Sequence, residues 1–137
     1  MKKDDCIFCK LANGEIPTNT VYEDDLVMAI LDNAPATKGH TLVIPKEHFA
    51  DLFEMSQEEA AEVMKRVRKV ADLLKEKLTP DGMNLMQNNG EVAGQTVRHF
   101  HMHLIPRYLS DPPHVNFNHA PEADPAALKV VLEEIRK

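Results

Sequence analysis

The sequence predicts an α+β fold: an antiparallel five-stranded sheet with one long helix and a C-terminal helix. Short β-rich segments bounded by turn residues predict the strands, one long stretch has helical periodicity, and a second helical stretch ends the chain. The order strand, strand, strand, helix, strand, strand is typical of an α+β architecture. With 137 residues, the chain is expected to form a single domain over residues 1–137.

The first three strands are predicted over residues 20–23, 26–32 and 40–44. Asp24 and Asp25 suit a hairpin turn between the first two. A loop over residues 34–39 leads to the third strand, which Pro45 is expected to stop.

The long helix begins at a capping box made by Ser56 and Glu59. Apolar residues then recur at spacings of three and four as far as Thr79-Pro80: Ala60, Val63, Val67, Val70, Leu74 and Leu78. This stripe is expected to face the core. A strand over 83–88, a polar loop over 88–94, an irregular stretch over 110–123 and a terminal helix over 124–136 complete the prediction.

Residues 99–107 read His-Phe-His-Met-His-Leu-Ile-Pro-Arg. A spacing of two matches the side-chain period of a strand, so His99, His101 and His103 are expected to line one face of a strand that Pro106 ends. The alternative is a polar strand face that happens to be rich in histidine, but such a face would also draw on Thr, Lys and Glu. Since imidazole serves as base, nucleophile or metal ligand near neutral pH, the pattern predicts a functional site.

Composition and charge narrow the classes of partner. A net charge of −6 argues against an extended interface with the phosphate backbone of a nucleic acid, whereas it is compatible with a small phosphorylated ligand held by local groups. No apolar run approaches ~20 residues and no signal peptide follows Met1, so we expect a cytoplasmic protein with no membrane partner. Cys6-x-x-Cys9 indicates metal or redox chemistry, but a redox motif of this kind normally follows a strand, and a charged tail precedes Cys6. Two inert thiols are the alternative.

Residues 94–105, Gly-Gln-Thr-Val-Arg-His-Phe-His-Met-His-Leu-Ile, resemble the signature of the histidine triad (HIT) nucleotide hydrolases and transferases. As in the Hint-like bacterial branch, Asp32 lies eight residues before His40-Thr-Leu-Val-Ile-Pro-Lys, and Asn88 precedes the triad at the family's distance. The resemblance covers a core over about residues 6–108 and leaves 109–137 as an extension. It implies a homodimer in which two sheets join edge to edge and each chain contributes its long helix.

Chemistry at a nucleotide phosphate needs a nucleophile, donors to the phosphate oxygens and a proton for the leaving group. The central imidazole, His101, is the natural nucleophile, and the resemblance implies that it takes the nucleotidyl group as a covalent phosphoramidate. His103, Gln95 and Thr96 are expected at the phosphate or leaving group. Thr96 stands where the Hint branch commonly has serine, which keeps the hydroxyl.

Asp32 is placed to accept from the ribose hydroxyls, although a turn-capping aspartate is the alternative on spacing alone. Asn88 also fits a plain turn, and the resemblance makes both of them nucleotide contacts. It also implies that His40 faces the nucleotide site and that apolar residues line a purine slot: Ile7, Phe8, Leu11, Ile30 and Leu42.

A closed structural zinc site needs four ligands. The resemblance implies that Cys6 and Cys9 are joined by His48 and His99. His114 and His119 are expected to be solvated in the tail.

The sequence as a whole predicts a purine nucleotidyl hydrolase or transferase, phosphoramidase-like toward adenosine or guanosine 5'-monophosphate conjugates. A dinucleoside polyphosphate hydrolase of the Fhit type and a non-catalytic zinc- and nucleotide-binding regulatory module are the alternatives. A metal site made by the triad itself is disfavoured, because alternate side chains of a strand lie ~6.5 to 7 Å apart.

Overall fold

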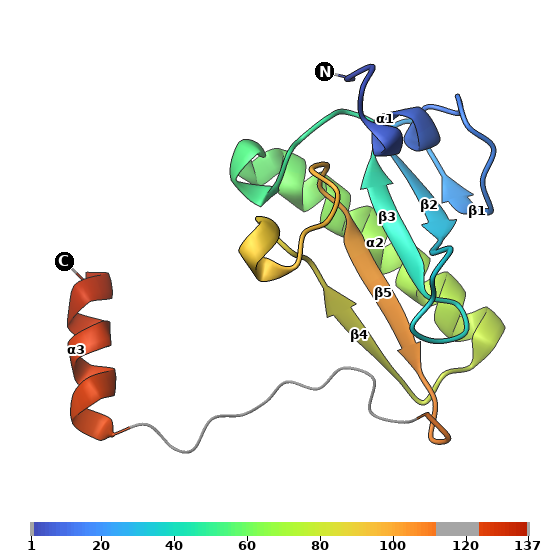
Figure 1. Cartoon of the computed structure of the whole chain (residues 1–137). Coiled ribbons are helices and arrows are strands. Elements are labelled where there is room, and N and C mark those ends of the chain that lie inside the picture. The colour runs from blue at the N-terminus through green and yellow to red at the C-terminus, as the bar shows by residue number, and fades with distance from the viewer. Residues whose placement is uncertain (1, 112–123, 137) are drawn as a thin grey trace.

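The structure, a computed structural model, describes residues 2–111 and 124–136 (Figure 1). Its elements in chain order are α1 (Ile7–Ala12), β1 (Thr20–Glu23), β2 (Val27–Leu31), β3 (Thr41–Pro45), the 3-10 helix η1 (Leu52–Glu54), α2 (Gln57–Leu78), β4 (Gly82–Met86), the 3-10 helix η2 (Glu91–Ala93), β5 (Met102–Arg107) and α3 (Pro125–Arg136). The predicted α+β class and the five-stranded antiparallel sheet are confirmed. His114, His119 and residues 112–123 of the predicted irregular stretch lie outside the described residues.

The sheet has the strand order β1-β2-β3-β5-β4, and its second strand, β2, is covered on both faces. Along β2, Val27 and Ala29 join the core beneath α2, whereas Met28 and Ile30 pack on the opposite side with residues of α1. Figure 1 shows α2 crossing behind the sheet and α1 at the end where β2 begins and β3 ends. A strand buried on both faces explains why β2 is a continuous apolar run rather than an alternating one.

Local hydrogen bonds fix the ends of two of the elements as the sequence predicts. In the β1–β2 turn, Asp24 Oδ1 accepts the backbone N–H groups of Leu26 and Val27. The capping box of α2 is present in both directions, because Ser56 Oγ accepts from the N–H of Glu59 and the Glu59 carboxylate accepts from that of Ser56. Such a cap stabilises a helix by about 1 kcal/mol.

The sequence did not predict the short helix α1, nor did it predict the 3-10 helices η1 and η2. Cys6 occupies the N-cap of α1, where Sγ accepts from the N–H of Cys9 at 3.3 Å. A helix of six residues is too short to show an apolar period. The sequence therefore showed the Cys-x-x-Cys motif but did not indicate that these residues are helical.

Several predicted strand boundaries are corrected by the structure: the strand over 26–32 is β2 (Val27–Leu31), and the strand over 83–88 is β4 (Gly82–Met86). Pro45 is the last residue of β3 rather than its stop, and Pro106 lies inside β5 opposite Met83. The Pro106 carbonyl accepts from Thr37 Oγ1 on the side of β5 that faces β3, and the Pro106 nitrogen faces the same side. The β3–β5 pairing ends before Pro106, so no backbone N–H is needed there to bond to β3. β5 begins at Met102, so His99 and His101 precede the strand and His103 alone lies on it.

Among the described residues, no helix combines the length and the apolar character needed to cross a membrane. The longest helix, α2, has one buried stripe and is otherwise lined with charged side chains.

The outer edge of β4 leads to a prediction about assembly. β4 pairs with β5 on one side, lies at the end of the strand order, and carries Leu85 with 47% of its surface exposed. Because open strand edges tend to pair with other strands, we expect two copies to join there. Sedimentation should therefore give about twice the chain mass of 15.5 kDa at micromolar concentration.

Leu85→Glu should shift the equilibrium toward the single chain, because it places two carboxylates at a symmetric contact. Leu26→Glu is the matched control, since Leu26 is also exposed, at 40%, but lies in the β1–β2 turn. A wild-type protein that sediments as a single chain would contradict this prediction.

Candidate functional site

A large hollow lies on the face of the sheet that carries α1. It has a volume of about 670 Å³ and an open mouth. Five segments supply its walls: α1, residues 16–19, the end of β2 with the loop after it, Leu42 of β3, and the stretch from Thr96 to His103. The residues that the argument uses are Ile7, Phe8, Leu11, Ile30, Leu31, Asp32, Leu42, Thr96, Val97, His101 and His103.

His101 sits in this pocket with a defined orientation of its ring. Its Nδ1 lies 2.8 Å from the backbone carbonyl oxygen of His99. Since a carbonyl only accepts, Nδ1 must carry the hydrogen, and the neutral ring then has its lone pair on Nε2. Burial lowers the pKa of His101, which favours this neutral form. The ring is therefore prepared to act as a nucleophile through Nε2.

His103 carries its ring hydrogen on the other nitrogen, Nε2. A hydrogen-bond chain from the N–H of Ala36 through His40 to His103 imposes this arrangement. The N–H of Ala36 donates to His40 Nδ1 at 3.0 Å, so neutral His40 carries its hydrogen on Nε2. His40 Nε2 lies 2.9 Å from His103 Nδ1, which accepts that hydrogen. Neutral His103 consequently carries its own hydrogen on Nε2, where it is a donor to a bound group.

The environment keeps the His40 and His103 rings uncharged near neutral pH. Burial, reinforced by the neighbouring His101 and His40 rings, lowers the pKa of His103 to about 4. Burial also lowers the pKa of His40, although the Asp32 carboxylate, with Oδ2 3.6 Å from His40 Nε2, acts in the opposite direction. The pocket thus presents one imidazole lone pair and one imidazole N–H side by side, with the His101 and His103 ring centroids 4.9 Å apart.

Apolar side chains form the wall that faces these rings. Phe8 meets His101 edge to face, with ring centroids 4.9 Å apart. The five apolar residues that the family resemblance assigned to a purine slot all line the pocket: Ile7, Phe8, Leu11, Ile30 and Leu42. An apolar wall next to polar groups suits an aromatic ligand that carries a polar substituent.

Asp32 has two roles in the structure. Its Oδ1 accepts the N–H of Ala34 at 2.9 Å, which is the turn-capping bond that the sequence left as an alternative. The residue also lines the pocket, with 22% of its side chain exposed. A carboxylate at this position can accept hydrogen bonds from a ligand's hydroxyl groups.

Three predicted contact residues do not line the pocket. Gln95 is 3% exposed, and its amide donates to the carbonyls of Ala50 and Val97 while it accepts from the N–H of Gly90, so it braces the loop rather than a phosphate. Asn88 Nδ2 is directed to the carbonyl of Gly94 at 3.4 Å. His40 lies behind His103 and acts on the pocket through it.

Some groups that shape the site had no signal in the sequence. The N–H of Ala36 and the carbonyl of Pro45 are backbone groups: every residue has the carbonyl, and every residue except proline has the N–H. Val97 and Leu31 line the pocket but are ordinary apolar residues. Their positions follow from the fold and could not be found from residue type.

A second cluster brings together the four predicted metal ligands Cys6, Cys9, His48 and His99, whose ligand atoms all lie within 4.8 Å of one another. His99 Nδ1 is 3.3 Å from Cys6 Sγ, 3.4 Å from Cys9 Sγ and 3.2 Å from His48 Nδ1. A tetrahedral zinc ion with two sulfur and two nitrogen ligands requires ligand separations of roughly 3.3 to 3.8 Å. The four residues therefore fit such an ion.

The orientation of His99 supports the same interpretation. Its Nε2 lies 2.8 Å from the carbonyl oxygen of Pro45 and must donate to it, which leaves the lone pair on Nδ1 directed at the cysteines. Burial raises the pKa of Cys9, so this thiol is not prepared as an exposed redox nucleophile.

The other cluster of potential metal ligands, Asp32, His40 and His103, is less suitable. A metal ion at His40 Nε2 would move the ring hydrogen to Nδ1, where the N–H of Ala36 already donates. Two hydrogens would then face each other. The geometry therefore favours a hydrogen-bond chain at this position, and a metal site made by the triad is further disfavoured because His99 is directed at the cysteines.

Comparisons with known proteins identify similar sequences. A model of the HIT domain matches residues 13–109. An uncharacterized HIT-like protein of Methanocaldococcus jannaschii is 50% identical over 131 residues, covering 96% of this chain and 98% of that protein. An adenosine 5'-monophosphoramidase of Schizosaccharomyces pombe is 46% identical over 74% of each chain. An adenylylsulfatase of Arabidopsis thaliana is 40% identical over 80% of this chain and 55% of its own length.

Solved structures are similar over almost the whole chain. A Streptococcus mutans protein has a TM-score of 0.91 and 47% identity, covering 98% of this chain and 85% of its own. A zinc-bound histidine triad family protein from Mycobacterium smegmatis has a TM-score of 0.75 and 36% identity, with 96% of each chain covered.

The lowered pKa of His103 predicts a pH dependence of stability. Between the ordinary histidine pKa of 6.5 and about 4, the unfolded chain binds a proton on this ring and the folded chain does not. The contribution of this group to the free energy of unfolding should therefore fall as the pH drops from about 6.5 toward 4. NMR titration of the ring Cε1–H should place His103 near 4, with the urea-unfolded chain as the reference. A midpoint at or above 6.5 in the folded protein would show that the ring is not desolvated as described.

Proposed function

The chain belongs to the HIT domain family, and we propose that it is a purine nucleotidyl hydrolase or transferase acting at the α-phosphate of adenosine or guanosine 5'-monophosphate conjugates. The observation that carries the proposal is the pair of rings in the pocket, where His101 presents the Nε2 lone pair and His103 presents an Nε2 hydrogen. Relatives named as a monophosphoramidase and an adenylylsulfatase support a hydrolytic reaction on adenylyl conjugates.

In the first step, His101 Nε2 attacks the α-phosphorus. A nitrogen–phosphorus bond forms, and the bond from phosphorus to the leaving group breaks with its electron pair on the leaving group, which takes a proton from solvent if it is an amine. The His101 ring becomes cationic, and its Nδ1–H donates to the carbonyl of His99, which stabilises that charge.

In the second step, water attacks the same phosphorus and the nitrogen–phosphorus bond breaks. The nucleoside monophosphate leaves, a proton of the water passes to solvent, and His101 returns to its neutral form. An alcohol or amine in place of water would make the same reaction a transfer.

The other pocket residues hold the substrate during both steps. His103 Nε2–H and the Thr96 hydroxyl are donors for the phosphate oxygens, and donors aimed at developing charge are a large source of rate enhancement. Asp32 accepts from the ribose hydroxyls, and the apolar wall with Phe8 receives the purine.

His101→Ala should abolish turnover of an AMP–amine conjugate and leave AMP affinity nearly unchanged, because it removes the nucleophile and keeps the binding walls. His103→Ala and Thr96→Ala are the matched comparisons and should lower kcat by about 10²-fold to 10³-fold, since each removes one donor. Steady-state kinetics measures kcat, and calorimetric titration measures the affinity for AMP.

The covalent intermediate gives an independent measurement. Rapid quench of the wild type into alkali, where phosphohistidine survives, should add one AMP to the peptide that contains residues 99–107. If the adduct maps to His99 or His103, or if His101→Ala keeps wild-type activity, the nucleophile is misassigned.

We also propose that Cys6, Cys9, His48 and His99 bind one structural zinc ion. Their separations fit the ion, and a similar structure is named as zinc-bound. Zinc in a closed four-ligand site contributes folding energy and takes no part in the chemistry. Because Ile7 and Phe8 lie between the two cysteines and line the pocket, this cluster also fixes the apolar wall.

Cys6→Ala should lose zinc, lower the melting temperature and weaken AMP binding about tenfold, because α1 loosens when its ligand is removed. Elemental analysis of protein purified without chelator, thermal unfolding and AMP titration test this together. Lys10→Ala in the same helix is the control and should keep the metal. Absence of stoichiometric zinc from the wild type would rule the proposal out.

A further inference from the structure

A second hollow adjoins the nucleotide pocket. It has a volume of about 360 Å³ and shares Ile7, Thr96 and Val97 with the first, so these residues form a common wall. Thr96 is the residue expected beside the phosphate or leaving group, and it therefore stands at the boundary. A substituent that extends from a phosphate next to Thr96 can enter this second hollow, which we call the side pocket.

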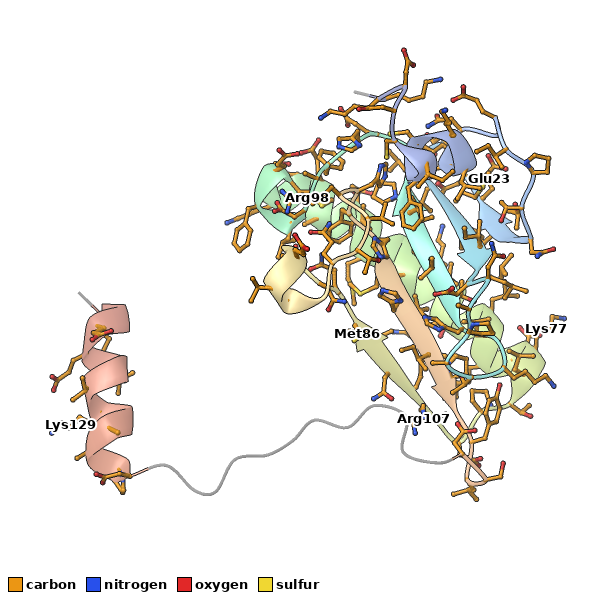
Figure 2. All side chains as sticks on the ribbon, viewed as in Figure 1. Glu23, Lys77, Met86, Arg98, Arg107 and Lys129 are labelled. Carbon is orange, nitrogen blue, oxygen red and sulfur yellow. The ribbon has the colours of Figure 1, made fainter. Side chains whose placement is uncertain are left out.

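The side pocket carries more positive than negative side chains. Lys3 and Arg98 line it together with a single carboxylate, Asp5. The nearest ion-pair contact of Arg98 is long, with 3.9 Å between its Nη2 and Asp51 Oδ2, and its side chain is 61% exposed. Figure 2 shows Arg98 at the end of the sheet that carries α1, opposite the end where Arg107 lies. The guanidinium has five N–H donors, so the long contact with Asp51 leaves donors for an oxyanion.

We propose that the side pocket binds the leaving group of the substrate and that Arg98 and Lys3 favour anionic leaving groups, namely the oxyanions of sulfate, phosphate or carboxylate anhydrides of the nucleotide. This rests on the proposed function and specifies the substrate class within it. The chain has a net charge of −6, which repels anionic leaving groups. Two cationic side chains next to the reaction site oppose that repulsion locally.

The chemistry of departure agrees with this preference. When His101 Nε2 attacks an adenylyl sulfate, the nitrogen–phosphorus bond forms, the phosphorus–oxygen bond breaks, and sulfate leaves as a dianion with the electron pair and no proton. An amine must gain a proton as it leaves. His101 Nε2 is bonded to phosphorus at this stage, and His103 Nδ1 accepts from His40 Nε2, so this hydrogen-bond arrangement leaves neither ring an extra proton to give. The pocket is therefore better equipped to accept an anion than to protonate an amine.

The experiment compares two substrates that share adenosine and the α-phosphate, namely adenosine 5'-phosphosulfate and adenosine 5'-phosphoramidate. Arg98→Gln should lower kcat/KM for the phosphosulfate about tenfold and change that for the phosphoramidate less than about twofold. Lys3→Gln should act in the same direction, which guards against a local folding defect at Arg98. Arg68→Gln is the matched control, because Arg68 is an exposed arginine of α2 paired with Asp72.

A second measurement separates binding from chemistry. In the His101→Ala background, which is expected to bind without turnover, the phosphosulfate should bind more tightly than AMP-amide, and Arg98→Gln should remove that difference. If Arg98→Gln leaves kcat/KM unchanged for both substrates, or lowers kcat/KM equally for both, the side-pocket assignment is overturned. If the wild type hydrolyses neither conjugate and forms no adduct, the proposed function itself fails, and that outcome is distinguishable from the first.

Discussion

The hydrogen bond from His101 Nδ1 to the carbonyl oxygen of His99 is the contact on which the proposed chemistry depends. It fixes the lone pair on the nitrogen that enters the pocket, and it later stabilises the cationic ring. Similar constraints act on the neighbouring rings, because Pro45 sets the proton of His99 and Ala36, through His40, sets that of His103. In the proposed function, His99, His101 and His103 would thus serve as a ligand, a nucleophile and a donor because their hydrogen-bond partners fix the ring protons differently.

Apolar residues and histidines alternate from His99 to Leu104, so packing of the apolar residues in the core determines where the imidazole rings lie. Phe100 and Leu104 lie in the cluster beneath α2, and the histidines between and beside them face the α1 side. A shift of one residue would bury the imidazoles under α2 and expose the apolar side chains. Hydrophobic packing against α2 therefore specifies which face of the chain the histidines occupy, even before β5 begins at Met102.

The sequence predicted the features that depend on residue type and period. The capping box of Ser56, the hairpin at Asp24 and the five strands were visible as patterns, whereas the resemblance to the HIT family added His48 and His99 to the Cys6-x-x-Cys9 motif. It failed where the decisive partner was a backbone atom or a distant segment. Gln95 looked like a phosphate contact, but three backbone groups from separate segments occupy its amide. Pro106 looked like a strand stop, but its nitrogen faces a side with no ladder to interrupt.

The position of α1 explains why a small helix matters to the whole site. Within its first turn, Cys6 and Cys9 face the cluster with His48 and His99, while Ile7 and Phe8 face the pocket. A helix of six residues is not stable alone, so its conformation must be held by what its side chains contact. His99 supplies a ligand atom to one site and its carbonyl oxygen to the nucleophile of the other. The two sites consequently share both a helix and a residue, and any group that orders the cysteine cluster also orders the wall and the ring that the reaction uses.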